Sequence, residues 1–380
     1  MQAIIENADL QQAVKVVSKA IGRKKYFPVL SGVRISGNGT GLEMATTNLE
    51  MYAHVYAGGI VENDGHEYTV VSLDSLADIV KALPKQGETV LETSGESIVI
   101  GGASLRMMPA EDYPDIDLGE DLQCIARMSG KEIKRIAQRI AATAIKATQT
   151  TRPSLTTIHI ETRASLAKFI GCDGYRLLIE TAKADTDGLT IGVDAQLFKK
   201  ACSAFSAKDD ISIHIASLGD SRTLRITNNA ISFDIREISD EFPDYTRVIP
   251  TAAFPAATEV VVGVAELLGL VKRAIPCTHP DTHGMTIDLE EGTLTVYASS
   301  EKAGDFIDSI SAMVRLKVES TDPLESFSLT CDAKMLETFL TGLDDEALRI
   351  ILTGDLQAMR FEPIEGRAWQ YVQMPINPKK

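Results

Sequence analysis

Residues 155–173 read LTTIHIETRASLAKFIGCD, in which apolar and polar side chains alternate on both sides of a polar turn. Alternation with a period of two predicts two antiparallel strands, because successive side chains of a strand point to opposite faces of the sheet. Two other stretches have the same plan: GVRISGNGTGLEMATTN at residues 32–48 and GMTIDLEEGTLTVYASS at residues 284–300. The strand–turn–strand unit therefore occurs three times.

Each strand pair lies between two amphipathic helical patterns, in which apolar residues recur every three or four positions. Long helices are expected at residues 8–22, 129–146 and 264–275, and short helices at 72–83, 193–203 and 331–342. The separations within the three helix pairs agree: 65 residues from Asp9 to Asp74, 64 from Gly130 to Asp194 and 67 from Ala265 to Asp332. This repetition of helix, strands, helix, strands indicates a triplicated chain.

The expected fold is α+β, with three similar domains that each combine two helices with antiparallel sheets. We place the domains at residues 1–122, 123–255 and 256–380, with the second boundary beside the Pro/Ala-rich stretch VIPTAAFPAAT. A chain of 380 residues is long enough for two or three hydrophobic cores.

The composition is that of an ordinary globular protein, with 44% hydrophobic and 24% charged residues. No apolar run approaches the roughly 20 residues that a membrane span needs, and the N-terminus shows no basic leader followed by an apolar block. The five cysteines are scattered and form no CxxC pair, which suits reduced thiols. These features favour a cytoplasmic protein with no membrane partner.

The net charge of −15 argues against nucleic-acid binding only if the charge is evenly spread. It is not, because the six helical windows, with the first two extended to residues 25 and 85, hold 17 Lys or Arg against 8 Asp or Glu. The helices therefore carry +9 and the rest of the chain −24. In the third helix, Lys131, Lys134, Arg135 and Arg139 lie opposite an isoleucine stripe. This segregation predicts one basic face that attracts a polyanion.

The stretch GCDGYRLL at residues 171–178 gathers a thiol, a carboxylate, a phenol and a guanidinium. An Asp-Gly pair between apolar runs is a common hairpin turn, whereas a nucleophilic Cys172 would need a base such as His159 brought round by the fold. The turn is the favoured interpretation, and no catalytic residue is assigned.

The stretch CTHPDTH at residues 277–283 allows a second chemical hypothesis, a C-x-H-x3-H metal site, but it lacks a fourth ligand. No phosphate-binding glycine motif stands between a predicted strand and a predicted helix. We therefore expect neither a metal nor a cofactor.

Taken together, the chain resembles the bacterial DNA polymerase III beta subunit family, the sliding clamps, over essentially its whole length. The resemblance rests on the order and spacing of FPVLSGV (27–33), TTNLEM (46–51), MMPAEDYPDID (107–117), CDGYRL (172–177), EFPDYTRVIP (241–250) and YVQMP (371–375). It implies the DNA-clamp fold, in which two three-domain protomers join head to tail in a six-domain ring with helices inside and sheets outside. The implied function is that of a non-catalytic processivity factor that encircles duplex DNA.

Double-stranded DNA is the first partner that this resemblance implies, bound through its phosphates without sequence specificity. The residues expected to face DNA are Arg23, Lys24, Lys25, Lys131, Lys134, Arg135, Arg139, Gln149, Arg152, Lys199 and Lys200. The fifth and sixth helices are nearly neutral, which predicts DNA affinity that is low or concentrated in the first two domains.

The resemblance also implies a hydrophobic pocket between the second and third domains. It would bind short linear peptides of the DNA polymerase III alpha subunit, the clamp loader, other polymerases and repair proteins. The implied pocket residues are Leu155, Cys172, Gly174, Tyr175, Arg176, Leu177, Pro243, Val248, Val372 and Met374. Arg176 is expected to close over the bound side chain or to donate to a peptide carbonyl. Cys172 and Tyr175 stand where the family usually has Thr and His, so peptide preference is expected to shift.

The homodimer interface implied by the resemblance places Ala103 and Leu105 against Ile275 and Pro276. Relatives use an aromatic residue and a leucine against Ile-Leu, so the smaller side chains here predict a weaker dimer. Two alternatives stay open at this point: a divergent accessory clamp with altered clients, and an enzyme that uses Cys172.

Overall fold

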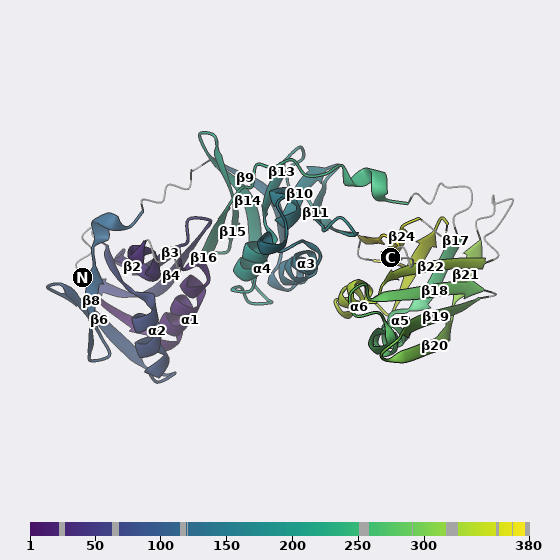
Figure 1. The fold of residues 1–380 in the computed structure, drawn as a ribbon. Helices are drawn as coiled ribbons and strands as arrows, with labels where there is room; N and C mark the ends of the chain where they lie inside the picture. Colours follow the sequence, from purple (N-terminus) through teal and green to yellow (C-terminus); the bar gives the residue numbers. More distant parts are fainter. Residues whose placement is uncertain are drawn as a thin grey trace. The chain divides into compact units, whose positions relative to one another are not determined.

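A computed structural model describes residues 1–22, 27–62, 68–114, 119, 121–250, 258–290, 292–316, 326–354, 357–366 and 368–376 (Figure 1). The chain forms two compact units. The first unit combines Met1–Lys134 with Ala184–Ile238, and the second combines Arg135–Lys183 with Ser239–Lys380. The division into three domains at residues 122 and 255 stays a prediction.

All six helices predicted from the sequence are present. They are α1 (Asn7–Val17), α2 (Leu73–Ala82), α3 (Gly130–Thr143), α4 (Ala195–Cys202), α5 (Val264–Ala274) and α6 (Ala333–Thr341). Each apolar stripe is buried, as in α5, where Leu267, Leu270 and Val271 are inaccessible to solvent. Among the described residues, no helix is long and apolar enough to cross a membrane.

The three short helices begin in the same way. The side chain of Ser72 accepts a hydrogen bond from a backbone N–H of α2, and Asp194 and Asp332 do the same at α4 and α6. Such caps satisfy backbone donors that the first helical turn leaves without partners. Ser72, rather than Asp74, is therefore the structural counterpart of the two aspartates.

The first unit contains a sheet of 12 strands in the order β1-β6-β7-β8-β5-β2-β3-β4-β16-β15-β14-β9. The first-repeat strands are β1 (Gln2–Glu6), β2 (Gly32–Gly37), β3 (Gly41–Thr47), β4 (Met51–Glu62), β5 (Thr69–Ser72), β6 (Glu88–Ser94), β7 (Ser97–Ile100) and β8 (Ala103–Met108). The second-repeat strands in this unit are β9 (Asp121–Ser129), β13 (Thr190–Asp194), β14 (Asp210–Leu218), β15 (Ser221–Thr227) and β16 (Ile231–Arg236). Antiparallel pairing of β4 with β16 joins the two repeats.

The second unit is built on a sheet in the order β10-β11-β12-β25-β24-β23-β17-β21 and a four-stranded sheet in the order β20-β19-β18-β22. Its strands are β10 (Thr157–Arg163), β11 (Leu166–Cys172), β12 (Arg176–Lys183), β17 (Thr258–Gly263), β18 (Gly284–Glu290), β19 (Thr293–Ser300), β20 (Gly304–Ser311), β21 (Met313–Leu316), β22 (Ser326–Asp332), β23 (Ala347–Leu352), β24 (Met359–Pro363) and β25 (Trp369–Gln373). Here β12 of the second repeat pairs with β25 near the end of the chain.

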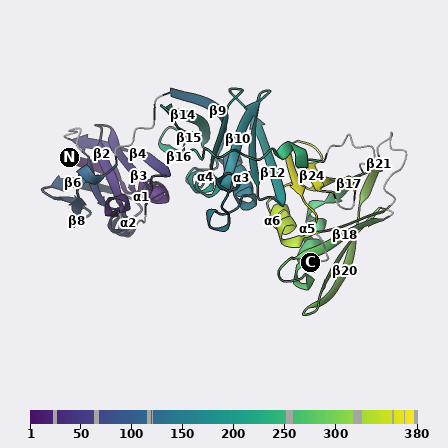
Figure 2. The ribbon, with the colours of Figure 1, turned by 45° about the horizontal axis from the view of Figure 1, so that its top comes forward.

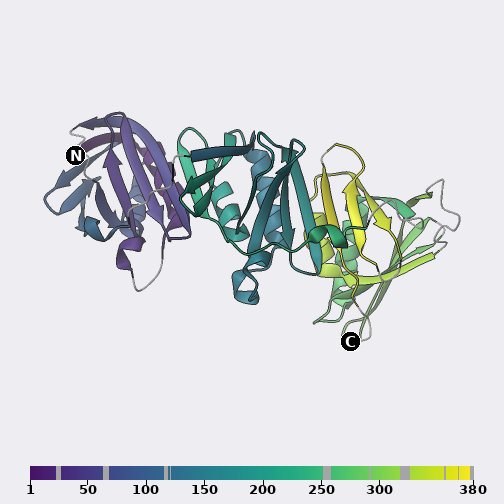
Figure 3. The ribbon, with the colours of Figure 1, turned by 90° about the horizontal axis from the view of Figure 1, so that it is seen from above.

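Helices cover the sheets in each unit. In the first unit, α1 packs against α2 and β4, and in the second, α5 packs against α6 and β20 (Figure 2). The strands of the first unit lie side by side when the molecule is seen from above (Figure 3). The predicted α+β class with antiparallel sheets is confirmed.

Candidate functional site

The turn in GCDGYRLL connects β11 to β12. One carboxylate oxygen of Asp173 (Oδ1) accepts hydrogen bonds from the backbone N–H groups of Tyr175 (2.9 Å) and Arg176 (2.8 Å). Gly174 has φ +89°, a conformation that only glycine adopts without strain. The interpretation of this stretch as a turn is confirmed.

Arg176 ties this turn to the nearby helix. Its Nε donates to Asp173 Oδ2 (2.8 Å) and its Nη2 donates to the backbone carbonyl of Ala142 in α3 (2.7 Å). Because the guanidinium already bonds the turn and the helix, Arg176 acts as a strut. The expected contact of Arg176 with a bound peptide stays a prediction.

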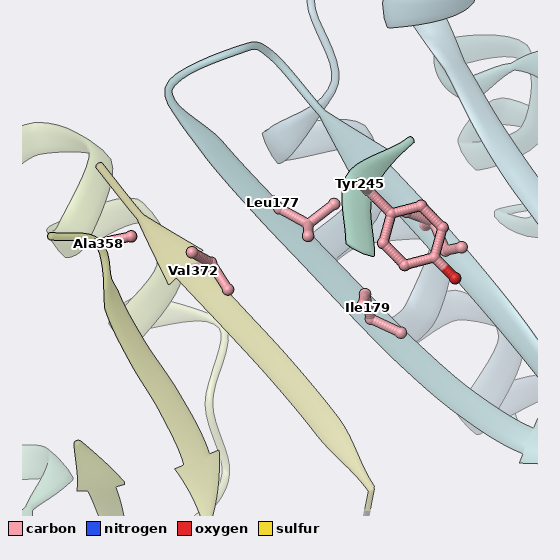
Figure 4. Packing of buried hydrophobic residues seen from close by; sticks show 6 residues of the cluster. Leu177, Ile179, Tyr245, Ala358 and Val372 are labelled. Carbon is pink, nitrogen blue, oxygen red and sulfur yellow. The ribbon is translucent and has the colours of Figure 1, made fainter. Parts of the chain in front are cut away.

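Beside the turn lies an apolar cluster that several of the predicted pocket residues share. It contains Ile170, Leu177, Ile179, Tyr245, Ala358 and Val372, with Cys172, Phe242 and Ile249 packed against it (Figure 4). Leu177 of β12 stands directly opposite Val372 of β25, and the backbone N–H of Met374 donates to the carbonyl of Tyr175 (2.8 Å). The pairing of β12 with β25 therefore brings Cys172, Leu177 and Val372 together.

The rim of this cluster is open to solvent. Tyr175, Pro243, Val248 and Met374 are all exposed. Such exposed apolar side chains beside a buried apolar floor are the composition expected of a ligand-binding surface.

A cavity of about 720 Å³ also borders the turn. It is lined by Leu155, Gly174 and Tyr175 from the predicted pocket and by Gln149 and Arg152 from the predicted DNA set, with Thr148, Thr150, Thr151 and Asp173 between them. Residues predicted to bind client peptides and residues predicted to face DNA thus line the same cavity.

Polar contacts support the segment that carries Pro243 and Val248. Tyr245 Oη donates to Glu161 Oε1 (2.5 Å), and Lys168 Nζ donates to the same oxygen (3.0 Å). Burial alone would raise the pKa of Glu161, but these two hydrogen bonds hold that pKa below its usual range. The segment is anchored to β10 and β11 through this network.

His159 supports the same segment by stacking. Its ring lies parallel to that of Phe242, with centroids 4.6 Å apart. Burial lowers the pKa of His159, partly opposed by the nearby Glu161 carboxylate. His159 is therefore a packing partner of Phe242, which in turn packs against the apolar cluster.

The thiol of Cys172 does not have the surroundings of a nucleophile. Burial raises its pKa, and its Sγ accepts a hydrogen bond from the backbone N–H of Gly174 (3.3 Å). Reactive cysteines have lowered pKa values instead. In the described part of the chain, no three His, Cys, Asp or Glu side chains are placed to hold a metal ion, and this includes the CTHPDTH stretch.

The predicted DNA-facing residues have three different outcomes. Lys131, Gln149, Arg152, Lys199 and Lys200 are exposed, and Lys134 is half-buried. Arg23, Lys24 and Lys25 lie outside the described residues.

Arg139 contradicts its prediction. It is only 6% exposed, its Nη1 lies 2.5 Å from Glu180 Oε1, and its guanidinium lies over the rings of Phe339 (5.7 Å) and Trp369 (5.2 Å). Arg135 pairs with the same carboxylate at 2.7 Å and is largely buried. These arginines neutralise buried Glu180, so the assignment of Arg139 to a DNA-binding face is wrong.

The predicted DNA-facing set omits two basic residues, Lys15 of α1 and Lys19 of the turn that follows it. Burial lowers the pKa of Lys19, and so do the nearby charges of Lys15, Lys200 and Lys134. Lys19 Nζ also donates to Ser203 Oγ (2.8 Å). The i, i+4 spacing of Lys15 and Lys19 on one helix face was the available signal.

The predicted dimer residues lie on β8 and directly after α5. Ala103 and Leu105 are half-buried on β8, Ile275 is half-buried after α5, and Pro276 is exposed. Residues 103–106 of β8 pair with β7 alone, and β20 pairs with β19 alone in its sheet. Within the described residues, both strands thus keep an unpaired edge.

Comparison with known proteins matches residues 1–117 to the family model of the DNA polymerase III beta subunit, N-terminal domain. The chain is 24% identical to the beta sliding clamp of Proteus mirabilis, over 99% of this chain and 100% of that protein. It is 22% identical to the beta sliding clamp of Streptomyces coelicolor, over 99% of both.

Solved structures give the same result for the fold. The DNA polymerase III beta subunit of Pseudomonas aeruginosa superimposes with a TM-score of 0.85 at 19% identity, covering 99% of this chain and 100% of that one. The beta subunit of Thermotoga maritima gives 0.83 at 20% identity, covering 99% of each. The family model matches the first repeat, the relatives are similar over the whole length, and the solved structures show that the chain has the fold of the bacterial DNA polymerase III beta subunit.

Proposed function

We propose that this chain is a processivity factor: two copies close into a ring around duplex DNA and tether client proteins. The observation that carries the proposal is the apolar cluster at the β12–β25 pairing, with Leu177 and Val372 at its floor and an exposed rim. A clamp has no catalytic chemistry of its own, and it acts by keeping other proteins on DNA.

The proposed client site comprises Leu155, Cys172, Gly174, Tyr175, Leu177, Pro243, Val248, Val372 and Met374, with Arg176 as the strut of its turn. Its clients would be the DNA polymerase III alpha subunit, the clamp loader, and other polymerases and repair proteins that carry short linear motifs. The apolar floor supports binding of leucine-like or aromatic anchors, and the exposed Met374 adds adaptable surface.

The lysines of the first unit support DNA binding through phosphates. Burial lowers the pKa of Lys19, and the nearby charges of Lys15, Lys200 and Lys134 lower it further. A phosphate would relieve this repulsion, and contacts made only to phosphates let a ring slide. The proposed site of this action is the cytoplasm.

The open edges of β8 and β20 support a head-to-tail ring of two copies. Ala103 and Leu105 would meet Ile275 and Pro276 of the other copy, and three domains per protomer, at 1–122, 123–255 and 256–380, would give six around the ring. The small contact predicts a dimer weaker than one built on large apolar side chains.

Retention on DNA circles tests this function. The protein is loaded onto nicked circular plasmid by a clamp loader, purified by gel filtration, and treated with an enzyme that linearises the plasmid. We expect it to stay on circles and to leave linear DNA, because its grip is topological. Sedimentation should show a dimer, and a strict monomer that never stays on circles would disprove the proposal.

A further inference from the structure

A second surface, outside the client site, lies on the exposed face of β4, β1 and β6. Ile60, Ile4 and Val90 stand directly opposite one another on these three strands. Ile60 is 63% exposed and Val90 43% exposed, with Ile4 half-buried between them. The three side chains form a continuous apolar row that crosses the strands. Contiguous exposed apolar side chains mark interaction sites, whereas isolated ones are ordinary on a protein surface.

Acidic side chains flank this row on both sides. Two residues along the strands in one direction lie Glu62 and Glu92, each opposite Gln2. Two residues in the other direction, Glu6 stands directly opposite Glu88. All four carboxylates are exposed, and none forms an ion pair within the described residues.

The Glu6–Glu88 pair is unfavourable in the isolated protein. Like charges directly opposite each other on neighbouring strands destabilise a sheet. A cation placed between the two carboxylates would remove that repulsion. The acidic flanks of the apolar row therefore favour a binding partner that carries positive charge.

The backbone of β1 cannot recruit a partner strand, since β1 already pairs with β4 on one side and β6 on the other. Recognition must use side chains. Strands in a sheet are about 4.8 Å apart, so the row spans about 10 Å, and its acidic flanks lie about 7 Å away on each side.

A helix laid across the strands matches these dimensions. Side chains at i, i+4 and i+7 of one helix face are spaced by about 5–6 Å, and Lys or Arg on both sides of that stripe would reach the glutamates. An anionic lipid surface or nucleic acid would be repelled by the same four carboxylates. We propose that Ile60, Ile4 and Val90, with their flanking glutamates, bind a basic amphipathic helix of a partner protein.

The test uses the full-length protein and a fluorescent synthetic helix with Leu at i, i+4 and i+7 and Lys on both flanks. Binding is followed by anisotropy. Changing Ile60→Ser together with Val90→Ser should weaken binding at least about tenfold, since both substitutions remove apolar surface that the bound helix would bury. Both positions are exposed, so the fold and retention on DNA circles should be unchanged.

The matched apolar control is the pair Tyr297 and Ile307, which also stand opposite each other and are 39% and 67% exposed. Changing both to Ser should leave binding within about twofold of the unchanged protein. If the unchanged protein fails to bind the peptide, or if both double variants lose affinity equally, the proposal is wrong.

A charge control separates this site from general attraction between a cationic peptide and an acidic protein. Glu62→Lys with Glu92→Lys changes the net charge as much as Glu290→Lys with Glu301→Lys does, and all four glutamates are exposed. Only the first pair should weaken binding by more than about tenfold, because it places two positive charges close to the lysines of the bound helix. Equal losses in both pairs would show non-specific attraction and overturn the site.

Discussion

The two places where successive repeats share a sheet have the same backbone and opposite polarity. At the first joint β4 pairs with β16, and at the second β12 pairs with β25. Each joint follows a turn of one design: Asn48 accepts from two backbone N–H groups as Asp173 does. The residue after each has positive φ, Leu49 at +73° and Gly174 at +89°.

Alternate positions along these strands carry the difference. On one face the first joint has Tyr52 and His54 of β4 beside Asp234 of β16, where the second has Leu177, Ile179 and Val372. The polar set lines a cavity of about 220 Å³. Burial raises the pKa of Asp234, opposed by its partner Arg225, so this face suits polar contacts.

On the opposite face the polarity is reversed. There the first joint has Val55 against Ile231, and the second has Glu180 against Trp369 with Arg139 paired to the carboxylate. Because successive side chains of a strand point to opposite faces, the two joints can differ in the polarity of each face without a change of backbone. At the second joint, the apolar face is the proposed client site and the opposite face holds the buried ion pair of Glu180 and Arg139.

Breaking the ion pair at the second joint should have the largest effect. Glu180→Gln leaves Arg139 and Arg135 buried without a counter-charge, and loss of one partner of a buried pair costs about 3–5 kcal/mol. The free energy of unfolding, measured by urea titration, should fall by that amount.

A compensating variant sharpens the test. Glu180→Met with Arg139→Met removes both members of the pair, so most of the lost stability should return. A Glu180→Gln protein as stable as the unchanged one would show that the carboxylate carries no structural role.

Val372→Asp places at the second joint the residue type that Asp234 provides at the first. Val372 stands opposite Arg360 as Asp234 stands opposite Arg225. Arg360 already pairs with Glu362, so the carboxylate of Val372→Asp would share that arginine. A carboxylate in the apolar floor should weaken binding of a polymerase tail peptide by at least about tenfold. Anisotropy measures the loss, and Asp234→Asn at the first joint should leave peptide binding unchanged.

The fold could be predicted from the sequence because period-two and helical patterns repeat three times at matched spacing. The turn could also be predicted, since Asp-Gly leaves few alternatives. The fate of Arg139 could not, because Glu180, Phe339 and Trp369 reach it only through tertiary pairing of distant segments. The sequence pattern of a basic residue on a helix is the same whether its charge is neutralised by a phosphate or by a buried carboxylate.

A smaller effect is expected from pH at the second joint. Burial against Phe242 lowers the pKa of His159, so its contribution to stability is complete above its ordinary value of 6.5 and is lost as pH falls through the folded-state pKa. The urea midpoint should therefore decrease below pH 6.5. His159→Phe should show less of this decrease, and an unchanged pH profile would contradict the role of the stack.

The smallest effect concerns the turn itself. Gly174→Ala places a Cβ at φ +89° with no atom within 4 Å of it, so strain is the sole native-state cost, about 1–2 kcal/mol. The less flexible unfolded chain offsets about 0.4–1 kcal/mol of this, which leaves a net loss of roughly 0.5–1 kcal/mol in the free energy of unfolding.

Leu49 occupies the equivalent position with a side chain because it packs beside the cluster of Val29, Leu30, Val70 and Tyr113. If Gly174→Ala costs nothing, the second turn tolerates a side chain as the first does, and its glycine would be retained for the client that passes over it.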